Sequence, residues 1–247
     1  MILTDDKQLE ALEARRVAEE QEQEPLPTYA SLQASSSAVP AAKAVNFIAI
    51  SRHHSSVRET LVIDASLFVP SFLRPPLSPG ETVGMQNNVK LESTHGHVYA
   101  DITLVGNRKN ARAVMHMKST HGGITAKIHG PPTRSAFVLH SQALNGEVRL
   151  HIPRNFQGPL IISHRHGSVR FSDNINCELT TFGEVDSTRR CFLGDFSRWS
   201  DAPGRWIGDE LVVEVKHGDV TIHYDDDVLG APVKTRPSTL LNRIFGL

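Results

Sequence analysis

The sequence predicts an all-β protein, organised as a β-solenoid-like stack of about seven repeated strand pairs. From Phe47 onward, short runs of apolar and β-branched residues alternate with polar residues, which is the period of a half-buried strand. A glycine with an apolar residue two positions after it recurs at intervals of 26, 24, 21, 27 and 24 residues. A sequence period between about 20 and 50 residues is typical of stacked-repeat architectures.

Six glycines mark the repeat, and we expect them to occupy structural turns. Residues 50–58 (ISRHHSSVR) parallel residues 162–170 (ISHRHGSVR), so a unit that lacks the glycine precedes the other six. A proline-containing insertion at 69–82 follows that first unit. Glycine admits the positive φ of a tight turn, and Asn145 followed by Gly146 is typical of a type I′ turn. The six glycines are Gly96, Gly122, Gly146, Gly167, Gly194 and Gly218.

The apolar side chains of each unit are predicted to share one face. They fall at positions −7, −5, +2, +4 and +6 from the repeat glycine, as at Met115, Met117, Ile124, Ala126 and Ile128. A period of two places all of them on one side of the strands. Two arrangements satisfy this pattern: a meander of hairpins with the glycine in the turn, or a coil whose two strands face one core. The spacing leaves both open.

Three segments follow from the change in composition along the chain. Residues 1–44 form an acidic arm and a Pro/Ser-rich linker, which is disordered or partly helical because three apolar residues give only a thin stripe. Residues 45–227 form the β-repeat domain. Residues 228–247 form a tail with a short helix, expected to cover an end of the stack. Binding of that helix to a partner or a membrane surface is the alternative.

Composition bears on compartment and partners. Lys plus Arg is 26 and Asp plus Glu is 27, so the net charge of −1 gives no reason to expect nucleic acid as a partner. No apolar run is long enough for a transmembrane segment, and the first residues lack the basic and apolar regions of a signal peptide. Cys177 and Cys191 fit neither a disulfide framework nor a zinc spacing. We expect a cytoplasmic protein, with the nucleus as the alternative.

Histidines precede the repeat glycine in four units, at His95, His121, His166 and His217. His54 has the matching place in the first unit. In a stack of units these imidazoles align in a row, with neighbours about 4.8 Å apart. The preferred interpretation is that they are exposed turn residues that tolerate positive φ as asparagine does, with no metal bound. A metal-binding or pH-sensing ladder is the alternative.

The sequence carries no catalytic constellation that we recognise. It has no nucleophile elbow, phosphate-binding loop or His-Glu-x-x-His motif. Cys177 and Cys191 flank Asp186 and two arginines, but such a cysteine is more often a buried small hydrophobe. The run of aspartates at 225–227 lacks the ligand spacing of a calcium loop and is expected to close the last strand as a solvated turn. We therefore expect that the protein is not an enzyme and that it binds no cofactor.

One linear motif is a candidate for binding a partner. Leu26, Pro27 and Tyr29 form a Leu-Pro-x-Tyr sequence of the kind that WW domains bind, and Pro25 extends its polyproline character. Because the segment lies in the predicted linker, it would be accessible to such a domain.

The glycine units also carry a resemblance to known families. Ser-x-x-Gly-x-Val/Ile at 93–98 and 119–124 resembles the repeats of bacterial adhesin-like β-solenoid families. The chain is similar to an uncharacterised fungal family, domain of unknown function 7330, in its Ile-Asp-x-Ser-Leu step at 63–67, the prolyl loop after it, the glycine repeats and the segment 191–196. The resemblance covers roughly residues 45–225 and implies a β-solenoid, without implying an activity.

The sequence thus predicts a non-enzymatic intracellular scaffold for protein interactions, because repeats supply long regular faces. A carbohydrate-binding or carbohydrate-active β-solenoid is one alternative, which would require carboxylates gathered on one lateral face. The outward positions are mixed instead, as at Glu92, Lys118 and Arg149. An adhesin-like surface protein is the other alternative, and it would require export.

Overall fold

The structure is a computed structural model that describes residues 43–77, 80–82, 84, 86–106, 111–196 and 206–227. The all-β class is confirmed in these residues, whose regular structure is almost entirely strand. Most of the predicted arm at 1–44, with the motif at Leu26, Pro27 and Tyr29, lies outside the described residues, as does the predicted tail at 228–247.

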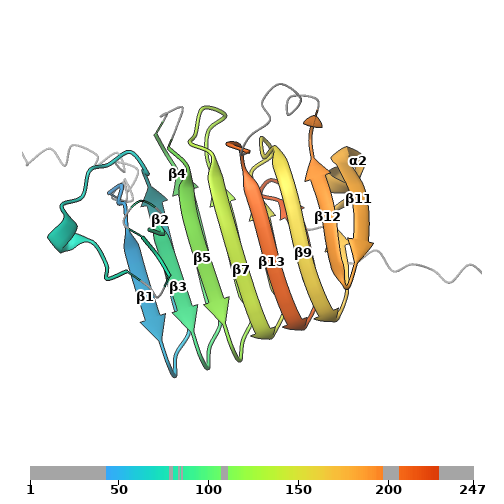
Figure 1. Cartoon of the computed structure of the whole chain (residues 1–247), viewed down its shortest axis with the longest axis horizontal. Coiled ribbons are helices and arrows are strands. Elements are labelled where there is room, and N and C mark those ends of the chain that lie inside the picture. Colours follow the sequence, from blue (N-terminus) through green and yellow to red (C-terminus); the bar gives the residue numbers. More distant parts are fainter. Residues whose placement is uncertain are drawn as a thin grey trace, which may run out of the picture. The chain divides into compact units, whose positions relative to one another are not determined.

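Two sheets form the described domain (Figure 1). The strands of the first are β1 (Ile48–Arg52), β3 (Val89–Ser93), β5 (Ala113–Ser119), β7 (Phe137–Asn145), β9 (Gly158–His166), β11 (Leu179–Val185), β12 (Thr188–Leu193) and β13 (Glu210–His217). The strands of the second are β2 (Val57–Ile63), β4 (Val98–Leu104), β6 (Ile124–His129), β8 (Val148–Ile152), β10 (Val169–Phe171) and β14 (Val220–Tyr224). The orders are β1-β3-β5-β7-β13-β9-β12-β11 and β10-β14-β8-β6-β4-β2.

The two strands of a repeat unit lie in different sheets. β3 pairs with β1 and β5, whereas β4, which follows β3 in the chain, pairs with β2 and β6. All of these pairings are parallel. At the turn of each such unit the chain therefore passes from one sheet to the other, so the hairpin pairing that the spacing left open is wrong for these units. Figure 1 shows these turns at the lower edge, where the parallel strands of the eight-stranded sheet end.

The apolar positions predicted from the alternation are buried. Positions +2, +4 and +6 after Gly96, Gly122, Gly146 and Gly218 are at most 4% exposed, and the two sheets close on one hydrophobic cluster. After Gly167, Val169 and Phe171 are only partly covered, and both lie on β10, an edge strand of the six-stranded sheet.

The order of the units in space departs from their order in the chain. β13 lies between β7 and β9, and β14 lies between β8 and β10, so the last unit is inserted between the units of Gly146 and Gly167. Val213, for example, has Ser141 on one side and Ile162 on the other. A stack in chain order would have placed this unit at the end. Insertion gives β13 a parallel partner on both edges.

A buried ion pair holds the inserted unit at its start. Asp209, directly before β13, receives two hydrogen bonds from Arg134, at 2.7 and 2.8 Å, and these side chains are 7% and 3% exposed. The same carboxylate accepts hydrogen bonds from the backbone N–H groups of Phe137 at 3.0 Å and Gln157 at 3.3 Å. Phe137 begins β7 and Gln157 precedes β9. One carboxylate thus joins the starts of three neighbouring strands.

The predicted unit around Gly194 is wrong. β11 and β12 form an antiparallel hairpin within the eight-stranded sheet, and β12 pairs antiparallel with β9. Gly194 ends β12 with a φ of 92°, but within the described residues no strand of the six-stranded sheet directly follows it. An unpredicted helix, α2 (Asp173–Glu178), precedes the hairpin and is capped by the Ser172 hydroxyl, which accepts a hydrogen bond from the Ile175 N–H. Within the described residues the other short helix is η1 (Ser71–Leu73).

Close stacking adds a second requirement for glycine at the turns, beside positive φ. A Cβ on Gly122 would lie 2.4 Å from the Gly96 oxygen, and a Cβ on Gly146 would lie 2.3 Å from the Gly122 oxygen. Gly146, Gly167, Gly194 and Gly218 have positive φ, whereas Gly96 and Gly122 do not. Asn145 does not have positive φ either, so the predicted type I′ turn is wrong. Backbones that approach this closely leave no room for a side chain of any kind.

Candidate functional site

The predicted histidine row exists, but it is divided into two groups. In spatial order the positions before the turn glycine are His54, His95, His121, Asn145, His217 and His166. The rings of His95 and His121 are stacked with centroids 5.0 Å apart, and those of His166 and His217 with centroids 4.8 Å apart. Asn145 separates the groups. None of these residues has positive φ, so the expectation that histidine is favoured there by its tolerance of that conformation is wrong.

A further histidine, which the sequence reasoning passed over, joins the first group. His53 directly precedes His54, and its Nδ1 lies 3.1 Å from Nε2 of His54. Its ring centroid is 4.3 Å from that of His54 and 5.2 Å from that of His95. Nitrogen atoms of these three exposed side chains all lie within 4.8 Å of one another. The sequence signal that could have found the cluster is the pair of adjacent histidines in the first unit, where His54 belongs to the row and His53 stands beside it.

The charge state of the cluster favours neutral imidazole at His95. Desolvation, and then repulsion from the neighbouring histidines, lowers the pKa of His95 below its usual value. A neutral imidazole can accept a hydrogen bond or a metal ion at one ring nitrogen.

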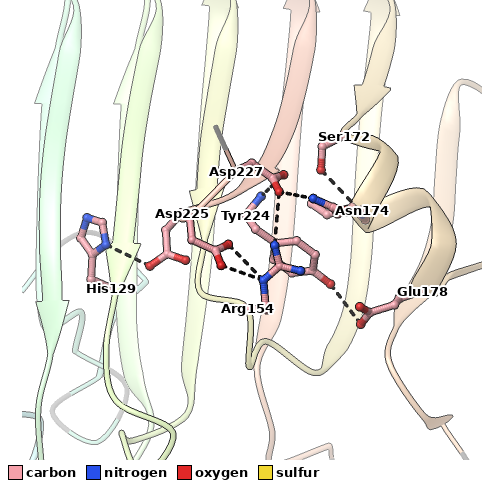
Figure 2. Close-up of polar contacts among 10 residues, drawn as sticks. His129, Arg154, Ser172, Asn174, Glu178, Tyr224, Asp225 and Asp227 are labelled. Carbon is pink, nitrogen blue, oxygen red and sulfur yellow. Dashed lines mark hydrogen bonds and ion pairs between the residues drawn. The ribbon is translucent and has the colours of Figure 1, made fainter. Parts of the chain in front are cut away.

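A second polar cluster lies where the strands of the six-stranded sheet end (Figure 2). Asp225 accepts a hydrogen bond from His129 at 3.0 Å, and the other ring nitrogen of His129 lies 3.3 Å from Asp101. Arg154 donates to Asp226 at 2.8 Å. One imidazole, that of His129, therefore holds the carboxylates of Asp101 and Asp225. In a glycosidase the two catalytic carboxylates face the substrate instead.

Asp227 is a structural anchor and is not solvated, contrary to the prediction for this turn. Its side chain is 6% exposed and accepts hydrogen bonds from the Tyr224 N–H at 3.0 Å and the Asn174 amide at 2.6 Å. Burial alone would raise the pKa of Asp227, but these donors and Ser172 outweigh it and lower the pKa. The contacts attach the beginning of α2 to the end of β14.

Tyr224 completes this attachment. Its hydroxyl donates to Glu178 at 3.1 Å, and the guanidinium of Arg154 lies 4.6 Å from the centre of its ring. Burial, followed by the charge of Glu178, raises the pKa of the Tyr224 hydroxyl well above its usual value. Figure 2 shows Glu178 reaching this hydroxyl from the last turn of α2. The cluster therefore fastens the helix over the end of the sheet.

The remaining predicted candidates do not assemble into a reactive site. Cys177 is exposed and Cys191 is buried, and both thiols are free. Cys191 lies 3.5 Å from the Thr181 hydroxyl, while Arg189 pairs with Glu184 at 2.8 Å.

An open trough of about 690 Å³ runs along the outer side of the eight-stranded sheet, with polar walls that include Lys118, Ser163 and Glu214.

An exposed apolar loop connects β2 to β3. Phe68 is 83% exposed, Phe72 is 82% exposed and Leu73 is 65% exposed, and two further leucines of the same loop are also exposed. Side chains of this size are usually covered, so a group of them on one short loop is a candidate contact surface. We call residues 67–77 the apolar loop.

Comparison with known families matches residues 46–227 to the family model of a domain of unknown function (DUF7330). The match spans 182 of the 247 residues, counted from 46 to 227 inclusive. The chain belongs to the DUF7330 family. No curated protein and no solved structure matches the chain. Within the described part of this DUF7330 chain, no helix is long and apolar enough to cross a membrane.

Two sequence steps that resembled DUF7330 have structural roles. Asp64 accepts hydrogen bonds from the N–H of Ser66 at 2.9 Å and from its hydroxyl at 2.6 Å, which turns the chain out of β2 into the apolar loop. In the segment 191–196, Phe192 is buried and packs edge-to-face against Trp206, with ring centroids 5.4 Å apart. Both steps shape the connections between strands.

Proposed function

We propose that this DUF7330 domain is a non-enzymatic scaffold that binds another protein through its apolar loop. The single observation that carries the proposal is the exposure of Phe68, Phe72 and Leu73 on one loop. Aromatic side chains are enriched among the residues that contribute most to protein–protein affinity. A partner with an apolar pocket or groove would cover them.

Side chains form hydrogen bonds with the backbone of the apolar loop, which supports this role. The Asn46 amide donates to the Leu67 carbonyl at 2.9 Å, and Asn88 donates to Asn46 at 2.6 Å. Both asparagines are buried. Asn88 also accepts from the Val114 N–H at 2.7 Å, which links the loop to β5. A loop ordered before binding loses less conformational entropy when the partner docks.

The base of the loop is fixed as well. Arg74 donates to the Val69 carbonyl at 2.8 Å, and its guanidinium lies 4.6 Å from the centre of the Phe47 ring. The Gln86 amide donates to the Pro75 carbonyl at 2.7 Å. These polar contacts use the backbone of the loop and leave its apolar side chains facing outward.

The test compares three full-length chains: wild type, Phe68→Ser with Phe72→Ser, and Phe182→Ser with Val185→Ser. The control pair is similarly exposed, at 62% and 63%, but lies on β11, the edge strand at the other end of the eight-stranded sheet. Proteins retained by wild type are identified, purified and titrated against each chain. We expect the loop variant to lose at least about tenfold in affinity and the control to keep its affinity. Equal binding by all three chains would reject the loop as the docking surface.

Three finer parts belong to the same proposal. The alternation of strands between two sheets supports a solenoid-like stack, similar to the adhesin-like families, with one unit out of chain order. The two free thiols support a cytoplasmic location. The motif at Leu26, Pro27 and Tyr29 supports a WW domain as a second partner. Titration of a WW domain with wild type and with Tyr29→Ala tests the last point, because the groove requires the tyrosine.

A further inference from the structure

We propose that His53, His54 and His95 form a surface binding site for a divalent transition-metal ion of the zinc type. Imidazole nitrogen is a preferred ligand of Zn²⁺, and three histidines with a water in the fourth position are a common set. His53 and His54 belong to the turn between β1 and β2, and His95 belongs to the turn between β3 and β4. Figure 1 shows these two turns at its lower edge. The site is separate from the apolar loop and does not depend on its role.

The separation of the first two ligands already suits a metal ion. Nδ1 of His53 and Nε2 of His54 are 3.1 Å apart. With Zn–N bonds of about 2.05 Å, this separation gives an N–Zn–N angle of about 98°, close to the angle at a tetrahedral ion. Without metal, one of these nitrogens must carry a proton to make the hydrogen bond between them. Metal binding replaces that shared proton, which moves to the other nitrogen of its ring.

The third ligand is held beside the first two by the backbone. β1 and β3 pair in parallel up to Arg52 and Ser93, and the contact continues into the turns. The His95 N–H donates to the His53 carbonyl at 2.9 Å, and the Thr94 N–H donates to the Arg52 carbonyl at 3.0 Å. The three ligands therefore come from two turns that are fixed to each other. This preorganisation lowers the entropy lost when a metal ion binds.

His95 needs only a side-chain rotation to complete the set. Its ligating nitrogen lies within 4.8 Å of those of His53 and His54, whereas tetrahedral ligands lie about 3.3 Å apart. The side chain is exposed, and exposed side chains change rotamer within nanoseconds. Rotation toward the metal breaks the stacking on His121, whose ring lies 5.0 Å away.

The second histidine group provides a matched control within the same chain. His217 and His166 are register partners with stacked rings 4.8 Å apart, so they present two imidazoles in the same kind of turn. The residues directly before them are Lys216 and Arg165, where the first unit has His53. Two cations in place of a third ligand repel a metal ion. The structure therefore assigns the metal site to the first group alone.

In the experiment, the full-length chain is freed of metal with a chelator and Zn²⁺ is titrated into it. Binding is measured by the heat released and by competition with a chromophoric chelator. The variants are His54→Asn, His95→Asn and the control His217→Asn, with circular dichroism to check folding. We expect one high-affinity ion per wild-type chain, a loss of at least about tenfold in affinity for each of the first two variants, and less than about a twofold change for the control. Because the ion stabilises the folded state that binds it, Zn²⁺ should raise the temperature of thermal unfolding in wild type and in the control only.

Two results would overturn the site. One is a wild-type dissociation constant above about 1 mM, which is weaker than three preorganised imidazole ligands should give. The other is an equal loss of affinity in His217→Asn and His54→Asn, which would place the ion elsewhere. If His54→Asn fails to fold, His95→Asn gives the same information, because its backbone contacts to the first turn are kept.

Discussion

Gly218 packs directly on the backbone of Gly146, although 72 residues separate the two in the chain. A Cβ on Gly218 would lie 2.2 Å from the Gly146 oxygen, and a Cβ on Gly167 would in turn lie 2.0 Å from the Gly218 oxygen. The amide of Gly146 donates to the His217 carbonyl at 2.9 Å, and that of Gly218 to the His166 carbonyl at 2.9 Å. The glycine of the inserted unit thus continues one ladder of touching turns.

Replacing a ladder glycine with alanine should destabilise the domain. Gly122→Ala places a methyl group 2.4 Å from the Gly96 oxygen, and the backbones must separate to admit it. We expect a loss of about 1 to 3 kcal/mol in the free energy of unfolding, measured in denaturant. Gly122→Asn should be no milder, because any Cβ meets the same oxygen. Gly183→Ala is the control, since nothing lies within 4 Å of its Cβ position. Equal stability of the two alanine variants would contradict the ladder.

Aspartate substitutions in the core should destabilise the domain more on the inner strands than on the edge strand β10. Ile124, Val148 and Val220 are fully buried, whereas Val169 is only partly covered. Aspartate at any of the first three should cost several kcal/mol and prevent cooperative unfolding. Val169→Asp should remain folded, because its carboxylate can reach water from the edge. Cooperative unfolding of Val148→Asp at wild-type stability would show that the inner face has been assigned wrongly.

Removing Arg134 should loosen the inserted unit. Arg134→Leu leaves the buried carboxylate of Asp209 without its cation, and we expect a loss of about 3 to 5 kcal/mol in unfolding free energy. Arg149→Leu is the control, because its ion pair with Glu147 is half exposed on both sides and should contribute about 0 to 1 kcal/mol. In Arg134→Leu, the rate of amide hydrogen exchange should increase in β13 before it increases in the other strands. Similar stabilities for the two variants would mean that Asp209 is satisfied without Arg134.

Stability should fall as the pH is lowered through the range in which unfolded histidine titrates. Burial, and then the charge of His223, lowers the pKa of His151, and burial lowers that of His116. A lowered folded pKa means that the unfolded state binds more protons, so stability present above about pH 6.5 is lost below it. Thermal unfolding should therefore occur at lower temperature at pH 5.5 than at pH 8.

His151→Gln isolates one contribution to this loss. Glutamine keeps a polar side chain beside His223 without titrating, so the difference between pH 8 and pH 5.5 should be smaller in the variant. The comparison at pH 8, where the imidazole is neutral, serves as the reference for any packing effect. An unchanged pH difference in His151→Gln would assign the loss to other groups.

The buried face and the turn positions were predictable because both depend on local pattern. Alternation with a period of two fixes which side chains of a strand share a face, and Val98, Ile124 and Val148 are buried as that rule requires. The glycines were found by their spacing, and the positive φ expected of them occurs at four of the six. Their close stacking was not predictable, since it involves residues in other units. The anchoring role of Asp227 depended in the same way on a helix that the pattern did not indicate.

The sequence by itself determined an all-β chain, the faces of its strands and the places where it turns, since each of these follows from neighbours along the chain. Only the tertiary structure decided which strands lie side by side. Pairing partners are far apart in sequence, so nothing in the repeat of Gly218 indicates that β13 lies between β7 and β9. The same non-local choice puts Asn145 between the two histidine groups and brings His53, His54 and His95 within reach of one ion.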